Sequence, residues 1–357
     1  MSRRLAVPAG AWGLGALQQV VELPGVTDVL VNGGERGPGG QRVWFDRGHG
    51  LESTEVALGD EQELRGLAVR LAAAAGRRLD ESMPWVDARL PGGVRLHAVV
   101  PPVTPAGTHV SLRLLGSSRL DLASLVSAGS VPPAWASVLR ALVLRRAAFL
   151  VTGGTGAGKT TLLAALLGIV PARERIVLVE DVGELRPLHP HVVRLEARHA
   201  NVEGRGEVTL DDLVRQALRM RPDRIVVGEC RGAEVRELLA ALNTGHAGGC
   251  GTLHANAAAE VPARLEALGS LAGLDRSAVH SQAAAALDAV VHVARGRSGR
   301  RVTEIAVVTG TAGGLAVLPA LVAAEGAGEP VAGRSGSGPG WPQLARRLGL
   351  PEEEPAP

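Results

Sequence analysis

The chain is poor in aromatic residues and in cysteine. Its 357 residues include no tyrosine, two phenylalanines and two cysteines. Cys230 and Cys250 form neither a CxxC pair nor a longer pattern, which excludes a disulfide scaffold or a zinc ribbon and favours a reducing compartment. The scarcity of rings also leaves no obvious platform on which the bases of a nucleic acid could stack. We therefore expect no stable nucleic-acid binding.

Long apolar runs and an excess of one charge are absent as well. No stretch reaches the ~18–20 apolar residues that a membrane span needs, and residues 315–324 are too few and include a proline. The first residues carry two arginines, but Pro8 and three glycines interrupt their apolar part, which argues against a secretory signal. The net charge of +2 excludes a uniformly basic surface. The sequence predicts a cytoplasmic protein that would serve a membrane process only through partners.

Lysine is nearly missing, since the chain has one lysine against 37 arginines. Together with abundant Ala, Gly and Pro, this composition indicates pressure towards amino acids with GC-rich codons. Lys159 is the exception. Because an ammonium is a compact point charge and a guanidinium is a wide planar fork, we expect a site at Lys159 that arginine does not fit.

Hydrophobic patterning divides the chain into four parts. Residues 1–115 combine strands predicted at residues 26–31, 41–45, 94–100 and 109–114 with a helix over residues 60–76, which indicates a small α+β domain. Residues 116–146 are predicted to form a linker and helices. Residues 147–310 alternate short apolar runs with helical stretches and end in a hairpin around the basic turn 295–301, as in a parallel sheet built from βαβ units. We expect residues 311–357 to be a largely disordered tail around one short helix.

Residues 153–160 read GGTGAGKT and match the phosphate-loop pattern GxxxxGK[ST], between an apolar run and a helical stretch. Small residues let backbone N–H groups surround a phosphate at a helix N-terminus. Lys159 would then reach the β- and γ-phosphates, and Thr160 would bind Mg²⁺. The alternative interpretation is a simple glycine-rich turn. The predicted nucleotide-binding residues of this loop are Gly153, Gly154, Thr155, Gly156, Ala157, Gly158, Lys159, Thr160 and Thr161.

The expected nucleotide is ATP. Guanine-specific proteins normally use an NKxD element, and a chain whose one lysine already lies in the phosphate loop cannot supply it. Small-molecule kinases share the loop, but they rarely combine it with a large separate N-terminal domain.

Two predicted strands of this third part end in acidic residues, IVLVED with Glu180 and IVVGE with Glu229. The carboxyl ends of strands beside a phosphate loop line the ligand crevice of a doubly wound sheet. A carboxylate there can hold Mg²⁺ or orient the attacking water. The alternative is that the acids cap the next helix, which suits Glu184 well and Glu229 poorly.

Residues 244–256 read TGHAGGCGTLHAN and contain two histidines, His246 in a glycine-rich loop and His254 at the end of a predicted strand. A zinc pair is conceivable, but the spacing is not one that zinc sites use. An ordinary surface histidine is the other interpretation.

Taken together, these segments resemble the ATPases of the type II/type IV secretion superfamily, most closely the tight-adherence (Flp) pilus branch of the CpaF/TadA type. The resemblance runs from about residue 26 to residue 308. It also rests on RLDESMPWVDARLPGGVRLHAVVPP at residues 78–102 and RMRPDRIVVGECRGAE at residues 219–234. It implies an α/β fold, with a RecA-like P-loop ATPase domain after a smaller α+β N-terminal domain, nucleotide between the two, and a homohexamer.

The resemblance also implies roles for single residues. Glu180 matches the acidic box, Glu229 the Walker B glutamate, and His246 and His254 the histidine box. Lys159, Glu180, Glu229 and His254 would be catalytic, and Thr160, Glu180 and Glu229 would hold Mg²⁺. Such a motor would drive pilus assembly, secretion or conjugal-type transfer through inner-membrane platform proteins, from the cytoplasmic face.

Charge that builds on the γ-phosphoryl group needs cations beyond one lysine. We predict that at least one of Arg89, Arg95 and Arg113 contacts the nucleotide, with Arg264 as a rival and ordinary surface arginines as the alternative. Two other functions stay open: a DNA-translocating motor, and a nucleotide-gated scaffold that hydrolyses ATP negligibly.

Overall fold

The structure is a computed structural model of the chain. It describes residues 13–34, 42–48, 50–90, 93–114, 120–198, 205–296, 299–323 and 336–353. Two compact units divide it, Met1–Ser118 and Arg119–Pro357, close to the boundary expected at residue 115. Within the described ranges, no helix has the length and apolar character that crossing a bilayer requires.

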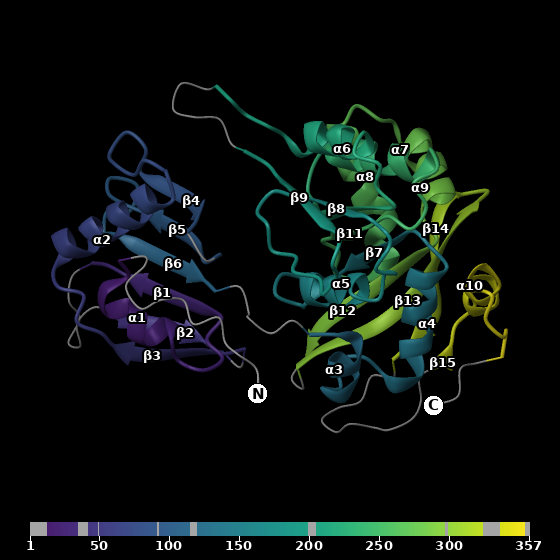
Figure 1. Ribbon diagram of the computed structural model, residues 1–357, viewed down its shortest axis with the longest axis horizontal. Coiled ribbons are helices and arrows are strands. Elements are labelled where there is room, and N and C mark those ends of the chain that lie inside the picture. The colour runs from purple at the N-terminus through teal and green to yellow at the C-terminus, as the bar shows by residue number, and fades with distance from the viewer. Residues whose placement is uncertain are drawn as a thin grey trace. The chain divides into compact units, whose positions relative to one another are not determined.

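The first unit is built on an antiparallel sheet of six strands with the order β3-β2-β1-β6-β5-β4 (Figure 1). Apolar residues alternate with polar ones along its strands, so one face is buried against the helices and the other is open. The capping box of Asp60 and Glu63 begins the longest helix. The elements are η1 (Gly15–Leu17), α1 (Gln18–Val21), β1 (Asp28–Asn32), β2 (Arg42–Asp46), β3 (Leu51–Glu55), α2 (Glu61–Ala74), β4 (Trp85–Arg89), β5 (Arg95–Val99) and β6 (His109–Arg113).

The second unit is built on a nine-stranded sheet with the order β15-β14-β13-β12-β7-β11-β10-β8-β9. The six strands from β12 to β9 in that order run parallel, and the other three are antiparallel. The parallel arrangement is the one that the alternating pattern predicts. The strands are β7 (Phe149–Thr152), β8 (Ile176–Glu180), β9 (Val192–Glu196), β10 (Arg224–Cys230), β11 (Cys250–Leu253), β12 (Ala289–Gly296), β13 (Gly299–Thr311), β14 (Gly314–Val322) and β15 (Gly336–Ser337).

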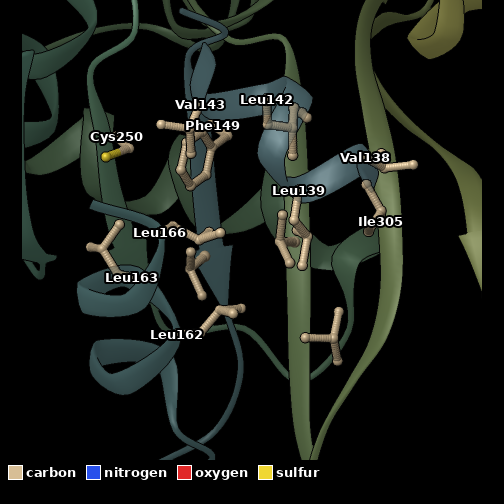
Figure 2. Close-up of a cluster of buried hydrophobic side chains, with 14 of the residues drawn as sticks. Val138, Leu139, Leu142, Val143, Phe149, Leu162, Leu163, Leu166, Cys250 and Ile305 are labelled. Carbon is tan, nitrogen blue, oxygen red and sulfur yellow. The ribbon is translucent and has the colours of Figure 1, made fainter. Parts of the chain in front are cut away.

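Helices cover both faces of this sheet, as in a doubly wound fold. On one face, Val143, Phe149, Leu163 and Leu166 pack together between two helices and the sheet (Figure 2). That face carries α3 (Leu122–Ser127), η2 (Pro133–Trp135), α4 (Ala136–Leu144), α5 (Lys159–Leu167) and α10 (Trp341–Leu348). The opposite face carries α6 (Leu210–Leu218), α7 (Glu234–Asn243), η3 (Ala258–Glu260), α8 (Val261–Leu271) and α9 (Arg276–Ala286).

The structure corrects the expectation of a largely disordered tail over residues 311–357. Residues Gly314–Val322 form β14, which extends the sheet, and Trp341–Leu348 form α10. Trp341, Leu344 and Leu348 lie at helical spacing and are almost fully buried, so their periodicity outweighs the Gly/Ser/Pro-rich composition around them. Residues 324–335 and 354–357 lie outside the described residues.

The segment expected to be a linker with helices also differs. Its two helices, α3 and α4, exist, but they belong to the core of the second unit. Trp135, between them, has no exposed surface. Apolar residues at helical spacing in α4 cover one face of the sheet. A free linker would leave that face exposed to water.

Candidate nucleotide site

The phosphate loop lies between a buried strand and a helix, as the motif predicts. β7 ends at Thr152, and α5 begins at Lys159 with Gly158 as its N-cap. Gly158 has a φ of +102°, which residues with a side chain rarely adopt. A Cβ added to Gly153 would lie 2.2 Å from the carbonyl oxygen of Val293 on β12. Glycine is therefore required here both by backbone conformation and by a neighbouring strand.

Lys159 turns back onto its own loop. Its side chain is buried, and Nζ donates hydrogen bonds to the carbonyl oxygens of Gly153 at 3.0 Å and Gly154 at 2.9 Å. The same Nζ lies 3.4 Å from Nε2 and 3.5 Å from Nδ1 of His254. The ammonium is thus held at the loop where a phosphate would be bound.

Glu180 is the last residue of β8 and is 3% exposed. Its Oε1 accepts hydrogen bonds of 2.8 Å from the backbone N–H groups of Glu184 and Leu185, while Oε2 is buried and accepts none among the described residues. Burial raises the pKa of Glu180 to about 7. Residues 181–191 form no helix, so Glu180 does not cap one.

Glycine at position 228 makes room for this carboxylate. A Cβ added to Gly228, on β10, would lie 2.6 Å from Cγ of Glu180 on the neighbouring strand β8. The IVVGE pattern therefore has a packing reason as well as a chemical one: the glycine lets the side chain of Glu180 cross in front of β10.

Glu229, near the end of β10, contacts Nε2 of His254 and the guanidinium of Arg231. Burial lowers the pKa of His254, and the charges of Lys159, Arg231 and Arg264 lower it further against the opposing effect of Glu229. A neutral His254 can donate from Nε2 to the carboxylate of Glu229. A different acid stands at the start of α7: Glu234, the first residue of the helix, accepts from the N–H groups of Arg231 and Gly232 in the turn before it.

The chain is similar to known proteins in family, in sequence and in fold. The model of the family described as type II/IV secretion system protein matches residues 18–307. A putative conjugal transfer protein of Mycobacterium tuberculosis is 59% identical over 303 residues, which cover 83% of this chain and 84% of that protein. The conjugal transfer protein TrbB of Rhizobium radiobacter is 31% identical over 290 residues, covering 80% and 84%. The chain belongs to the type II/IV secretion system protein family.

The solved structure of the pilus retraction motor PilT with bound ADP shares the fold, with a TM-score of 0.57 and 23% identity over 88% of this chain and 83% of that one. The predicted fold class, an α/β P-loop ATPase domain with a smaller α+β domain, is confirmed. The family is one of ATPases, and the loop and acidic strand ends of this chain suit such an enzyme.

The structure separates the two histidines of residues 244–256. β11 runs parallel to β7, and Leu253 pairs with Thr152, so His254 follows β11 at the edge where the phosphate loop begins. His246 precedes β11 and lies at the opposite edge, about 13 Å away along a four-residue strand. Its Nδ1 lies 3.3 Å from the carbonyl oxygen of Ala241 in α7. His254 joins the site and His246 does not.

The residues present suit Mg²⁺ that arrives with a nucleotide. Thr160 is the second residue of α5, and the carboxylates of Glu180 and Glu229 add hard oxygen donors at the same edge of the sheet. The unpaired Oε2 of Glu180 is a lone acceptor of the kind that a cation or its water would satisfy. Among the described residues, no three His, Cys, Asp or Glu side chains gather to bind a metal alone. Mg²⁺ commonly takes one or two carboxylates plus substrate phosphates, which fits this arrangement.

The three candidate arginines of the first unit form a row. Register pairs Arg89 with Arg95 and Arg95 with Arg113, across β4, β5 and β6. Residues directly opposite share a face, and here it is the open face, because the adjacent row, Ala88, Leu96 and Leu112, is buried. Arg95 binds Asp87 in a bidentate pair. Whether any of the three contacts nucleotide stays a prediction.

The sequence interpretation missed one set of neighbours of the loop. Arg300, on β13, donates from Nε to the carbonyl oxygen of Gly156 at 2.8 Å, and His292, on β12, lies 2.9 Å from the hydroxyl of Thr152. The basic turn 295–301 was visible in the sequence. Its position beside the phosphate loop depends on the pairing of β12 with β7, 140 residues apart, which no local pattern shows.

Proposed function

We propose that this chain hydrolyses ATP at the phosphate loop that contains Lys159. The reaction would be coupled to pilus assembly, protein secretion or conjugal-type transfer through an inner-membrane machine. One observation carries the proposal: a phosphate loop with a buried lysine and two carboxylates, Glu180 and Glu229, meet at one edge of a parallel sheet. Membership in a secretion ATPase family, and relatives named conjugal transfer proteins, support the transport role.

Each side chain has a role in this proposal. The loop residues Gly153–Thr161 bind the phosphates through backbone N–H groups, and Lys159 exchanges its carbonyl partners for β- and γ-phosphate oxygens. Thr160, together with Glu180 or Glu229, would hold Mg²⁺, which would supply positive charge beside the phosphates. Glu229, fixed by His254 and Arg231, orients the water whose oxygen attacks the γ-phosphorus as the bond to the ADP oxygen breaks.

The partners follow from the same proposal. We expect a homohexamer that acts from the cytoplasmic face on platform proteins of the inner membrane. The finer assignment to the tight-adherence pilus branch rests on the motifs alone, since the reported relatives carry conjugal transfer names. Stable nucleic-acid binding is not expected.

Release of phosphate from ATP in the presence of Mg²⁺, measured with and without an inner-membrane platform protein, tests the proposal. Hydrolysis that needs Lys159 and rises with the platform protein would support the motor. ATP binding without measurable hydrolysis under both conditions would point to the nucleotide-gated scaffold. A titration with DNA at several salt concentrations separates the translocase, for which tight and salt-sensitive binding is expected.

A further inference from the structure

The β12–β13 hairpin runs past the end of β7 and beside the phosphate loop. β12 pairs with β7 in parallel up to His292 and Thr152, where β7 ends, and continues to Gly296. β13 returns from Gly299 in antiparallel register. The carbonyl oxygen of Val293 lies against Gly153, so the hairpin is in contact with the loop from its first glycine.

Two arginines of the hairpin face the loop. Arg295 and Arg300 are directly opposite in the register, so they share a face of the ribbon. Nε of Arg300 donates to the carbonyl oxygen of Gly156, and its Cδ would lie 3.3 Å from a Cβ added to Gly158. Nη1 of Arg295 would lie 3.9 Å from a Cβ added to Gly156. Both side chains therefore lie over the part of the loop between Gly156 and Gly158.

The guanidinium of Arg300 has donors to spare. It carries five N–H groups, and among the described residues its one hydrogen bond leaves from Nε. The terminal amino groups are thus available beside a loop whose only lysine is engaged with loop carbonyls. A cation that is already anchored loses little conformational freedom when it binds an anion there.

We propose that Arg300 binds the phosphate oxygens of a nucleoside di- or triphosphate from within the same chain, with the charge of Arg295 adding to the attraction. This deepens the proposed function and rests on it in one respect, that the nucleotide occupies the phosphate loop. The hydrogen bond from Nε to the carbonyl oxygen of Gly156 holds the guanidinium at the loop. The two Nη groups supply the charge-assisted hydrogen bonds to phosphate.

The binding of ADP to the purified full chain, measured by calorimetry, tests this assignment. Arg300→Ala removes the charge and the hydrogen bond to Gly156. Arg300→Gln removes the charge but keeps an amide nitrogen at the place of Nε, attached to Cδ. Arg301→Ala is the matched control, because it removes the same charge from the next residue, which faces the other side of the hairpin.

We expect the Kd of ADP to rise about tenfold in both Arg300 variants, which corresponds to about 1.4 kcal/mol, and to change less than about twofold in Arg301→Ala. Competition by pyrophosphate should weaken by the same factor, because the contact is to phosphate and not to the base. Circular dichroism confirms that each variant is folded.

Three results would overturn the assignment. The first is unchanged ADP affinity in Arg300→Ala. The second is wild-type affinity in Arg300→Gln, which would show that the arginine only stabilises the loop through its Nε hydrogen bond. The third is a loss of ADP affinity in Arg301→Ala as large as that in the Arg300 variants. A wild-type chain that binds ADP but hydrolyses no ATP would contradict the proposed function and leave this assignment standing. A wild-type chain that binds no ADP would contradict both.

Discussion

Lys159 is enclosed by its own loop, and this enclosure predicts intolerance of arginine. Its buried Nζ fits between the carbonyl oxygens of Gly153 and Gly154, where a planar guanidinium has no matching space. We expect Lys159→Ala and Lys159→Arg each to lower ATP hydrolysis at least ~100-fold, because the phosphate charge loses its compact partner. Phosphate release at saturating ATP and Mg²⁺ measures the loss.

Arg140→Lys is the control for the exchange itself, since Arg140 lies exposed on α4, and it should keep wild-type turnover. Near-normal turnover in Lys159→Arg would show that the lone lysine of this chain is a chance survivor.

A substitution at Glu229 should affect ATP hydrolysis without affecting ATP binding. Gln in its place keeps the shape and the contact with His254 but loses the charge that orients water or holds Mg²⁺. We expect Glu229→Gln to bind ATP with an affinity within about threefold of wild type and to hydrolyse it ~100-fold or more slowly. Glu207→Gln, at an exposed position, serves as the control. Unchanged turnover in Glu229→Gln would make Glu229 a structural residue.

The buried carboxyl group of Glu180 should make the stability of the fold depend on pH. Burial raises its pKa from the ordinary 4.5 to about 7, so the folded chain binds a proton that the unfolded chain has lost. This group therefore has no effect on stability below about pH 4.5, destabilises the fold progressively as the pH rises to about 7, and has its full effect above, about 3 kcal/mol at most.

The neutral amide of Glu180→Gln removes this cost and keeps the acceptor for the N–H groups of Glu184 and Leu185. Without nucleotide or Mg²⁺, we expect its Tm to exceed that of wild type by several degrees at pH 8 and to match it near pH 5. Thermal unfolding followed by circular dichroism checks this. A Tm difference that is the same at both pH values would show that Glu180 is ionised in the fold at all of them.

At the scale of the elements, the open face of the first sheet predicts a functional row. Arg89, Arg95 and Arg113 lie side by side on β4, β5 and β6, where Arg95 pairs with Asp87 and Arg113 with Asp28. A phosphate group that reaches this face would meet three cations in one row. We expect at least one single alanine variant to lower ATP hydrolysis more than tenfold with an unchanged circular dichroism spectrum. Arg70→Ala, an exposed position on α2, is the control. Full activity in all three variants would remove the prediction.

Local pattern explains which elements could be predicted. The strand, loop and helix around Lys159 lie within about twenty consecutive residues, and the motif specifies the turn, so they were predicted closely. Strands β3 and β4 were missed: β3 is mostly exposed and polar, so no apolar alternation marks it. The tail was misjudged because glycine and proline around α10 obscured the helical spacing of Trp341, Leu344 and Leu348.

Contacts between distant segments explain what the sequence could not show at the site. Lys159 and His254 are 95 residues apart, and Arg300 and Gly156 are 144 apart. His254 was singled out by family resemblance, which carries such long-range information. Nothing comparable marked Arg300, and its role depends on which strand lies next to β7.

At the scale of the whole molecule, side chains of the nucleotide site in the second unit are partly exposed. The side chains of His254 and Glu229 are 31% and 22% exposed, so water reaches the groups that would orient the attacking molecule. A neighbouring copy that covers this edge would exclude water and strengthen the electrostatic interactions there. A head-to-tail contact that repeats at a fixed rotation closes into a ring, which is the expected hexamer.

Two measurements follow from this assembly. Light scattering with a non-hydrolysable ATP analogue and Mg²⁺ should give a mass near six chains, and hydrolysis per chain should rise with protein concentration until the ring is filled. Lys159→Ala, which is expected to lose nucleotide binding, should remain smaller under the same conditions if nucleotide promotes closure. A monomer that keeps full activity per chain at nanomolar concentration would contradict the ring, because it would show that one copy completes its own site.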